Sequence, residues 1–198
     1  MKSSILRAGV ALACALGLAA CGGGDGDQYL TGTIESGVTK DGLVLTNNGG
    51  DDLAVPANAT GFQFSKRIST DDQFNIQVKS YPSNVKTCTI VNGSARANYY
   101  TIAQIRMSCE IKTHKLVIAI NGLTTNGLIL VNGTDKQTIA ANETSREIAP
   151  VYEDGAYGIT VLQQPTGQTC RVSGGSSGNG SGIMGSTDLV NSVVVTCS

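Results

Sequence analysis

The chain has 198 residues, with 14 basic and 15 acidic side chains and a formal net charge of −1 at neutral pH. A chain this close to neutral lacks the basic surface that binds nucleic acid or anionic lipid headgroups, so we expect neither as an electrostatic partner. Hydrophobic residues make up 40%, charged residues 15%, and there are 25 glycines. This composition is typical of a folded, β-rich chain and not of a disordered one.

The N-terminal segment has the three parts of a secretory signal. Lys2 and Arg7 give a positive start, residues 8–17 form a short apolar run, and residues 18–21 (Leu-Ala-Ala-Cys) place small side chains at a cleavage point. Neither this run nor any later segment reaches the roughly 20 consecutive apolar residues that a spanning helix needs. We therefore expect residues 1–20 to be a signal peptide that is removed.

A cysteine directly after Leu-Ala-Ala resembles the lipobox of bacterial lipoproteins. In that family the cysteine thiol is joined to diacylglycerol, the leader is cut before it, and the new amine is acylated. The resemblance implies a lipidated Cys21 that anchors the protein to a membrane. Gly22 in place of aspartate implies the outer membrane, with the protein facing the periplasm or the cell surface. Residues 21–29, rich in glycine, are expected to form a flexible tether. An ordinary secretory signal with a chance cysteine at the cut is the alternative.

Cysteine usage fits an extracytoplasmic protein. Of the six cysteines, we expect Cys14 to leave with the signal and Cys21 to carry the lipid. The even set that remains lies in an oxidising compartment, where disulfides form and persist. Four cysteines allow three connectivities, and their number alone does not choose among them. The four are Cys88, Cys109, Cys170 and Cys197.

One sequence unit occurs twice after the tether. Residues 42–47 read GLVLTN and residues 127–132 read GLILVN, and Gly37 or Gly122 stands five residues before each. Both units also close on a β-branched segment that ends in a cysteine. A repeat of this kind indicates one supersecondary design used twice.

The repeat predicts the domain layout and the disulfides together. One domain is expected at about 30–112 and a second at about 113–198, each with its own pair of cysteines. A bridge that closes a loop of a couple of dozen residues stabilises a domain by about 3 kcal/mol. The expected pairs are Cys88 with Cys109 and Cys170 with Cys197.

Period-2 alternation predicts about seven short strands per unit. With turn residues at regular spacing, this pattern is typical of an all-β fold of antiparallel β-sandwiches. In the first unit the predicted strands are 31–36, 42–47, 51–56, 61–66, 73–81, 86–92 and 101–110. In the second unit they are 114–121, 127–132, 135–141, 145–151, 156–164, 168–173 and 190–197.

The order of these motifs resembles a module that recurs in tandem in proteobacterial surface and secreted proteins. The resemblance implies an immunoglobulin-like sandwich that serves as a spacer or display unit, with no catalytic residue to carry over. The chain has 0 Trp and so lacks the core tryptophan of antibody domains, which makes that likeness architectural only. The matching segments are 42–53, 62–64, 74–78, 87–93 and 160–170.

Few residues offer catalytic or metal chemistry. His114 is the single histidine, and in its polar surroundings we expect a solvated linker residue, not part of a triad or a zinc site. The glycine-rich run 174–182 lacks the lysine and helix of a phosphate-binding loop, so we expect a mobile hairpin loop. Clustered carboxylates are calcium ligands in some sandwiches, but we expect solvated turn residues at 51–52, 71–72 and 153–154.

Tyr99 and Tyr100 are the most notable aromatic pair. They come near the start of the predicted strand 101–110, where neighbouring side chains point to opposite faces. At most one of them is then expected in the core, and the other is exposed and able to anchor a partner or a sugar. Ordinary packing of the pair is the alternative.

These features predict a non-enzymatic, membrane-anchored envelope lipoprotein that acts as a protein-binding, adhesion or structural display module. The expected partners are the membrane, through the lipid, and an envelope or surface protein. No cofactor and no metal are expected. A carbohydrate- or calcium-binding lipoprotein is the alternative, and an accessory subunit of an enzyme comes after it.

Overall fold

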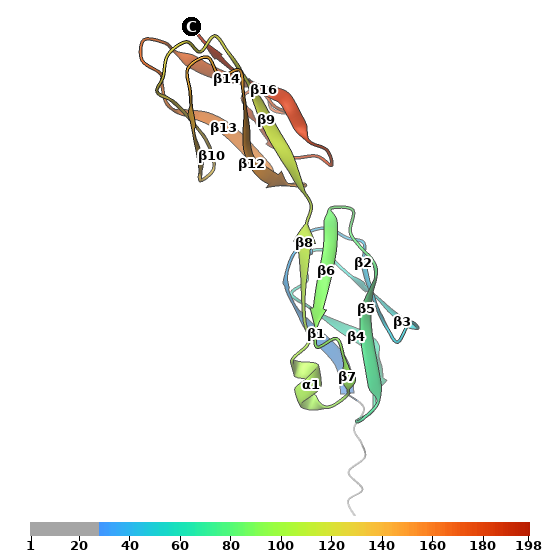
Figure 1. The fold of residues 1–198 in the computed structure, drawn as a ribbon. Coiled ribbons are helices and arrows are strands. Elements are labelled where there is room, and N and C mark those ends of the chain that lie inside the picture. Colours follow the sequence, from blue (N-terminus) through green and yellow to red (C-terminus); the bar gives the residue numbers. More distant parts are fainter. Residues whose placement is uncertain (1–27) are drawn as a thin grey trace, which may run out of the picture.

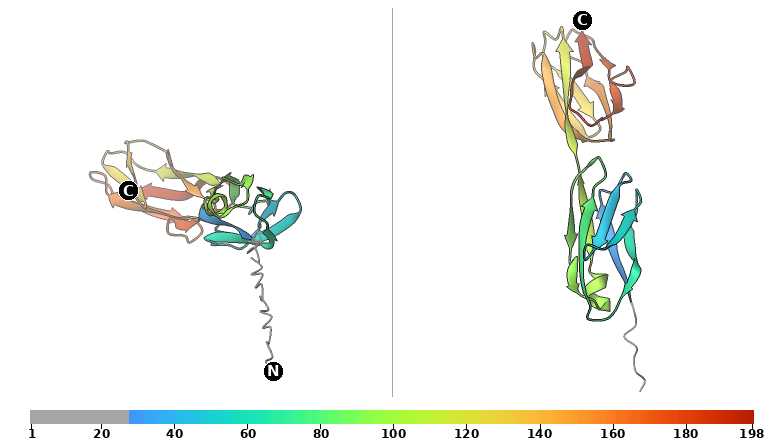
Figure 2. Two further views of the ribbon diagram at one scale, coloured as in Figure 1. Left: turned by 90° about the horizontal axis from the view of Figure 1, so that it is seen from below. Right: turned by 90° about the vertical axis from the view of Figure 1, so that its right-hand side faces the viewer.

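The computed structural model describes residues 28–198. The predicted signal peptide and Cys21 lie outside the described residues. Two β-sandwiches follow one another along the chain and stack end to end, which gives the molecule an elongated shape (Figure 1; Figure 2). Among residues 28–198, no helix is long and apolar enough to cross a membrane.

The first sandwich consists of two four-stranded sheets and one short helix. The first sheet has the order β4 (Gly61–Ile68), β1 (Gln28–Ser36), β8 (Arg106–Ile111) and β6 (Val85–Val91). The second sheet has the order β3 (Asp51–Val55), β2 (Leu43–Asn47), β5 (Gln73–Ser80) and β7 (Ser94–Arg96). The helix α1 (Tyr99–Ala103) connects β7 to β8.

The second sandwich repeats this arrangement without the helix. One sheet has the order β12 (Ser145–Tyr152), β9 (Thr113–Asn121), β16 (Leu189–Cys197) and β14 (Cys170–Gly174). The other has the order β11 (Asp135–Ile139), β10 (Leu128–Asn132), β13 (Ala156–Gln163) and β15 (Ser181–Ile183).

The identical strand order in both sandwiches confirms the predicted fold of two tandem immunoglobulin-like units. One detail differs from a purely antiparallel design. The first and last strands of each unit pair in parallel, β1 with β8 and β9 with β16, while the other pairs are antiparallel. Alternation of side chains assigns residues to faces but does not report strand direction, so the sequence pattern does not reveal these parallel pairs.

Each sandwich has its own hydrophobic core. The alternation that predicted β5 is visible in its burial, because Phe74 and Ile76 are buried while the residues beside them are exposed. Phe64 joins Phe74 in the first core, whereas aliphatic residues such as Leu116 and Leu130 dominate the second. Burying one side chain of this size stabilises the fold by about 1.5–3 kcal/mol relative to leaving it exposed.

The predicted strand 101–110 is wrong in its first half. A short helix occupies Tyr99–Ala103, and the strand begins only at Arg106. Asn98 caps the helix: its side-chain oxygen accepts hydrogen bonds from the backbone N–H groups of Tyr100 and Thr101 at 2.9 and 3.0 Å. The Thr101 hydroxyl accepts from the Asn98 N–H at 3.0 Å. This reciprocal cap stabilises a helical turn in a segment too short for a helical period to be visible.

Two smaller differences concern element boundaries. β1 already includes Gln28 and Tyr29, which the sequence pattern assigns to the tether. The three-residue strands β7 and β15 were not predicted, because three residues show too little alternation to be recognised.

Candidate functional site

Both disulfides join neighbouring strands at the C-terminal side of their units. Cys88 of β6 is bonded to Cys109 of β8, and Cys170 of β14 is bonded to Cys197 of β16. In both pairs the two cysteines are direct cross-strand partners in the antiparallel register. The predicted pairing, one bridge within each sandwich, is confirmed.

Tyr99 and Tyr100 are both on the surface. Their exposed fractions are 74% and 75%, and their rings meet edge to face with centroids 5.7 Å apart. The expectation that adjacent residues point to opposite faces is wrong here, because the two tyrosines lie in the first turn of α1 and not on a strand. Ile102, two residues later, is the helix residue that enters the core.

A shallow groove lies between this helix and β1. Arg67 of β4 is stacked over the ring of Tyr29, with its guanidinium carbon 4.1 Å from the ring centroid, a cation–π contact. The groove has a volume of about 360 Å³. Tyr99 of the helix lines it as well, and so does Gln28, where the described chain begins. The groove therefore lies at the point where the N-terminal segment joins the sandwich.

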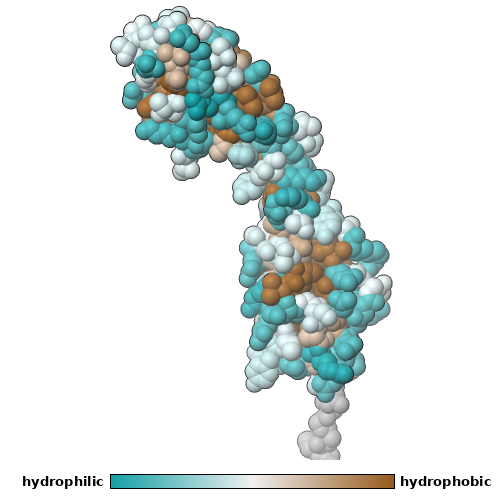
Figure 3. Space-filling model, viewed as in Figure 1, coloured by the Kyte–Doolittle hydropathy of each residue, from teal (hydrophilic) through white to brown (hydrophobic). Residues whose placement is uncertain are grey.

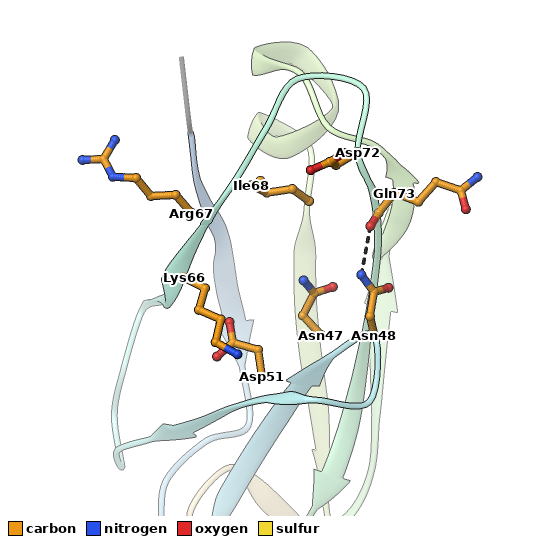
Figure 4. A pocket seen from close by; sticks show the side chains of 8 residues that line it. All are labelled: Asn47, Asn48, Asp51, Lys66, Arg67, Ile68, Asp72 and Gln73. Atoms are coloured by element: carbon orange, nitrogen blue, oxygen red, sulfur yellow. Dashed lines mark hydrogen bonds between the residues drawn. The ribbon is translucent and has the colours of Figure 1, made fainter. Parts of the chain in front are cut away.

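A second, more polar pocket shares Arg67 with the groove, and Figure 4 shows the side chains that line it. Its volume is about 370 Å³. Two side-chain amides in its wall are hydrogen-bonded to the backbone of β5. Asn48 donates to the carbonyl of Gln73 at 2.9 Å, and Asn47 accepts from the N–H of Asn75 at 3.0 Å. Its lining residues are Asn47, Asn48, Asp51, Lys66, Arg67, Ile68, Asp72 and Gln73.

Two of the acidic pairs, 51–52 and 71–72, each contribute a carboxylate to this polar pocket. Asp52 pairs with Lys79, and this hydrogen bond lowers the pKa of Asp52. Asp51 and Asp72 line the polar pocket together with the basic side chains of Lys66 and Arg67 (Figure 4). Within residues 28–198 there is no group of three or more His, Cys, Asp or Glu side chains that could hold a metal ion.

The glycine-rich run of the second sandwich is tied at both ends. The N–H of Gly180 donates to the carbonyl of Gly174 at 2.8 Å, and that of Gly175 donates to Ser192 at 2.8 Å. The last residues of the run form the start of β15, which pairs with β13. The run is thus the connection between β14 and β15 inside the second disulfide loop.

A single residue links the two sandwiches. β8 ends at Ile111 and β9 begins at Thr113, so Lys112 alone stands between them. Its N–H donates to the carbonyl of Asn84 in the first sandwich at 2.9 Å, and its carbonyl accepts from the N–H of Glu153 in the second at 2.9 Å. The linker is therefore hydrogen-bonded to both sides.

Side chains from both sandwiches meet beside this linker. Asp154 Oδ2 lies 3.1 Å from Lys40 Nζ and accepts a hydrogen bond from Asn84 Nδ2 at 3.1 Å. Asn84 is fully buried, and its amide also donates to the hydroxyl of Thr39 at 3.0 Å. Loops distant in sequence thus form one polar contact at the junction.

His114 is part of this junction, and the prediction of a solvated linker residue is wrong. It is the second residue of β9, and its side chain is only 15% exposed. Nε2 lies 3.2 Å from Glu153 Oε2, and Nδ1 lies 3.7 Å from Asp188 Oδ1. Glu153, predicted as a solvated turn residue, is 7% exposed. Both ring nitrogens therefore face carboxylates that belong to the second sandwich.

No local sequence pattern predicts the contact between Asp154, Lys40 and Asn84. The three residues are far apart along the chain, and an asparagine in a turn normally predicts solvent exposure. The one available signal was the near absence of residues between the last predicted strand of the first unit and the first strand of the second. So short a connection forces neighbouring loops into contact.

A scan against protein-family models found none that matches the chain, and a search of curated proteins also found no match. Among solved structures, the pilus adhesin SpaC from Lactobacillus rhamnosus GG is 11% identical over 86% of this chain and 31% of its own, with a TM-score of 0.41. An iodide-soaked C-terminal fragment of the same adhesin is 12% identical over 86% of this chain and 96% of the fragment, with a TM-score of 0.39. This chain thus spans less than a third of the first adhesin chain.

Proposed function

We propose that the protein is an outer-membrane lipoprotein, anchored through Cys21, whose two sandwiches form a non-enzymatic module that displays a protein-binding surface. The observation that carries this proposal is the junction at Lys112. A one-residue linker hydrogen-bonded to both units, reinforced by Asp154, makes a stiff spacer instead of two freely jointed domains. An anchor at the N-terminal end then holds the second sandwich away from the membrane.

Exposed strand edges support a protein partner. β6 is bonded to a strand on one side only, and an open edge of this kind accepts a further strand. Along it Ile90 is half-buried and Val91 is 52% exposed. In Figure 3 hydrophobic colour gathers over the middle of the lower sandwich, where β6 and β8 lie in Figure 1. Leu162 and Val190 add exposed apolar side chains on the second sandwich.

The anchor is tested by mass spectrometry of the mature protein from membranes. We expect acyl groups on Cys21, and we expect Cys21→Ala to release a folded protein from the membrane fraction. Cys14→Ala is the matched control, because Cys14 lies within the predicted signal and its loss leaves acylation unchanged. An unmodified N-terminus at another residue would refute the anchor.

The display function is tested in intact cells with a photo-crosslinking residue placed at Val91, Leu162 or Val190. A discrete adduct of one mass, formed from one or more of these exposed positions, is the expected result. The buried Leu130 serves as the control position and is expected to form no adduct. If none of the three exposed positions gives an adduct, the proposed protein partner is wrong.

A further inference from the structure

We propose that the lower end of the first sandwich, formed by Tyr29, Tyr99 and Tyr100, lies against the headgroup region of the bilayer. This proposal rests on the anchor at Cys21 and adds a second contact with the same membrane. The contact is made by tyrosine side chains at the end of the sandwich where the chain enters β1.

The first argument is where the aromatic residues are. The chain has 6 Tyr and 0 Trp, and three of the tyrosines surround the start of β1. Tyr29 is the second residue of that strand, and Tyr99 lines the same groove as Gln28. Tyr99 and Tyr100 are the most exposed of the large apolar side chains among residues 28–198.

The second argument is the length of chain between the anchor and the sandwich. Six residues, 22–27, separate Cys21 from Gln28. Even fully extended, seven residue steps span at most about 25 Å. The end of the sandwich that carries Gln28 is therefore held near the membrane surface. The second sandwich lies at the opposite end of the molecule (Figure 1).

The third argument is the chemistry of this end. Tyrosine combines an apolar ring with a polar hydroxyl and is enriched at membrane–water interfaces for that reason. The charged side chains nearby are of both signs, since Lys66, Arg67 and Asp72 line the neighbouring pocket. A contact through aromatic rings, not through net positive charge, thus fits the near-neutral composition of the chain.

The absence of tryptophan from the sequence makes this contact measurable. A Tyr100→Trp substitution introduces a unique fluorophore at a surface position, where it leaves the core unchanged. The lipidated full-length variant is placed in vesicles of phosphatidylethanolamine and phosphatidylglycerol with brominated acyl chains. We expect its emission to shift to the blue and to be quenched, relative to the same variant released by Cys21→Ala.

Tyr152→Trp is the matched control. Tyr152 is also well exposed, at 62%, but it belongs to the second sandwich, so we expect its emission to be unchanged and unquenched. Equal emission from Y100W and Y152W in an acylated protein would overturn the proposed contact and leave the anchor intact. An unacylated Cys21, detected by mass in the same samples, would overturn both.

Discussion

Asp71 and Asp154 occupy the same position in the two sandwiches. Both have left-handed backbone conformations, with φ of 69° and 64°. The N–H of Asp71 donates to the carbonyl of Ala97, and that of Asp154 donates to Met184, both at 2.9 Å. Only Asp154 reaches across to a neighbouring sandwich, where it contacts Lys40 and Asn84. The same turn therefore occurs in both units, but only in the second unit does its aspartate contact the other sandwich.

This equivalence gives a controlled test of the junction. Asp154→Gly removes the side chain while keeping a residue suited to positive φ, and Asn84 loses a hydrogen-bond acceptor. We expect the free energy of unfolding to fall by about 1–2 kcal/mol. We also expect the two sandwiches to move more independently of each other, which NMR relaxation measures. Asp71→Gly makes the same backbone change without a partner in the other sandwich. If both variants alter the interdomain motion equally, Asp154 does not stiffen the junction.

The glycines that mark the repeat are required by close backbone contacts. A Cβ atom at Gly37 would lie 1.9 Å from the carbonyl oxygen of Cys109, and one at Gly122 would lie 2.4 Å from that of Cys197. We expect Gly37→Ala and Gly122→Ala each to destabilise its own sandwich by about 2–4 kcal/mol, measured by urea unfolding.

Gly49→Ala separates the steric effect from backbone strain. Gly49 also has positive φ, at 72°, but no atom lies within 4 Å of its added Cβ. We expect Gly49→Ala to lower the free energy of unfolding by only about 1 kcal/mol. A loss as large as that of Gly37→Ala would show that strain alone accounts for the effect.

Each disulfide is expected to stabilise its own sandwich. The bonded cysteines are separated by 21 residues in the first unit and 27 in the second. Loop entropy then predicts a loss of about 3 kcal/mol when either pair is replaced by alanine. In each double variant the untouched sandwich is the internal control. The unfolding of the two units, followed by residue-resolved hydrogen exchange, should change only where the bridge was removed.

The ion pair between Arg146 and Glu143 makes the stability of the second sandwich depend on pH in the acid range. The Nε and Nη2 atoms of Arg146 donate to the two carboxylate oxygens of Glu143 at 2.6 and 2.7 Å, which lowers the pKa of Glu143. Because the folded-state pKa lies below the unfolded one, the pair stabilises the fold above the ordinary glutamate pKa. That stabilisation is lost as the pH falls through the lowered value.

We expect Glu143→Gln to lower the free energy of unfolding by about 0.5–1 kcal/mol at neutral pH. When this free energy is measured by urea unfolding at a series of pH values, it should fall less steeply on the acid side than in the unsubstituted protein. Glu147→Gln is the control, since Glu147 and Lys115 form a longer, more exposed pair at 3.4 Å. A Glu143→Gln profile as steep as that of the unsubstituted protein would contradict this role.

Sequence patterns predicted the architecture because the features on which the fold depends occur in both sequence units. Gly37 and Gly122 mark equivalent turns, and the last strand of each unit ends near a cysteine. Comparing the two units therefore predicted both the tandem sandwiches and the disulfides. Strand alternation was also informative in long strands such as β5, although it placed the start of β8 too early.

The surface features could not be predicted in the same way. α1 depends on a local cap at Asn98. Because of this helix, Tyr99 and Tyr100 are both exposed, whereas the sequence pattern left room for one of them in the core. The burial of His114 and Glu153 depends on contacts beside the junction, which no local pattern records. Features that depend on one residue meeting another across the fold are visible only once the fold is known.

The parallel pairing of β1 with β8 also determines how the first sandwich carries mechanical load. The chain enters at the start of β1 and leaves at the end of β8, so tension between the two ends pulls these neighbouring strands in opposite directions. Thr33 and Ile34 lie opposite Arg106 and Met107, and the hydrogen bonds along this ladder are sheared together instead of opening one after another. The last strand is moreover cross-linked to β6 through Cys109. Under a pulling force, we therefore expect the hydrogen bonds between β1 and β8 to share the load.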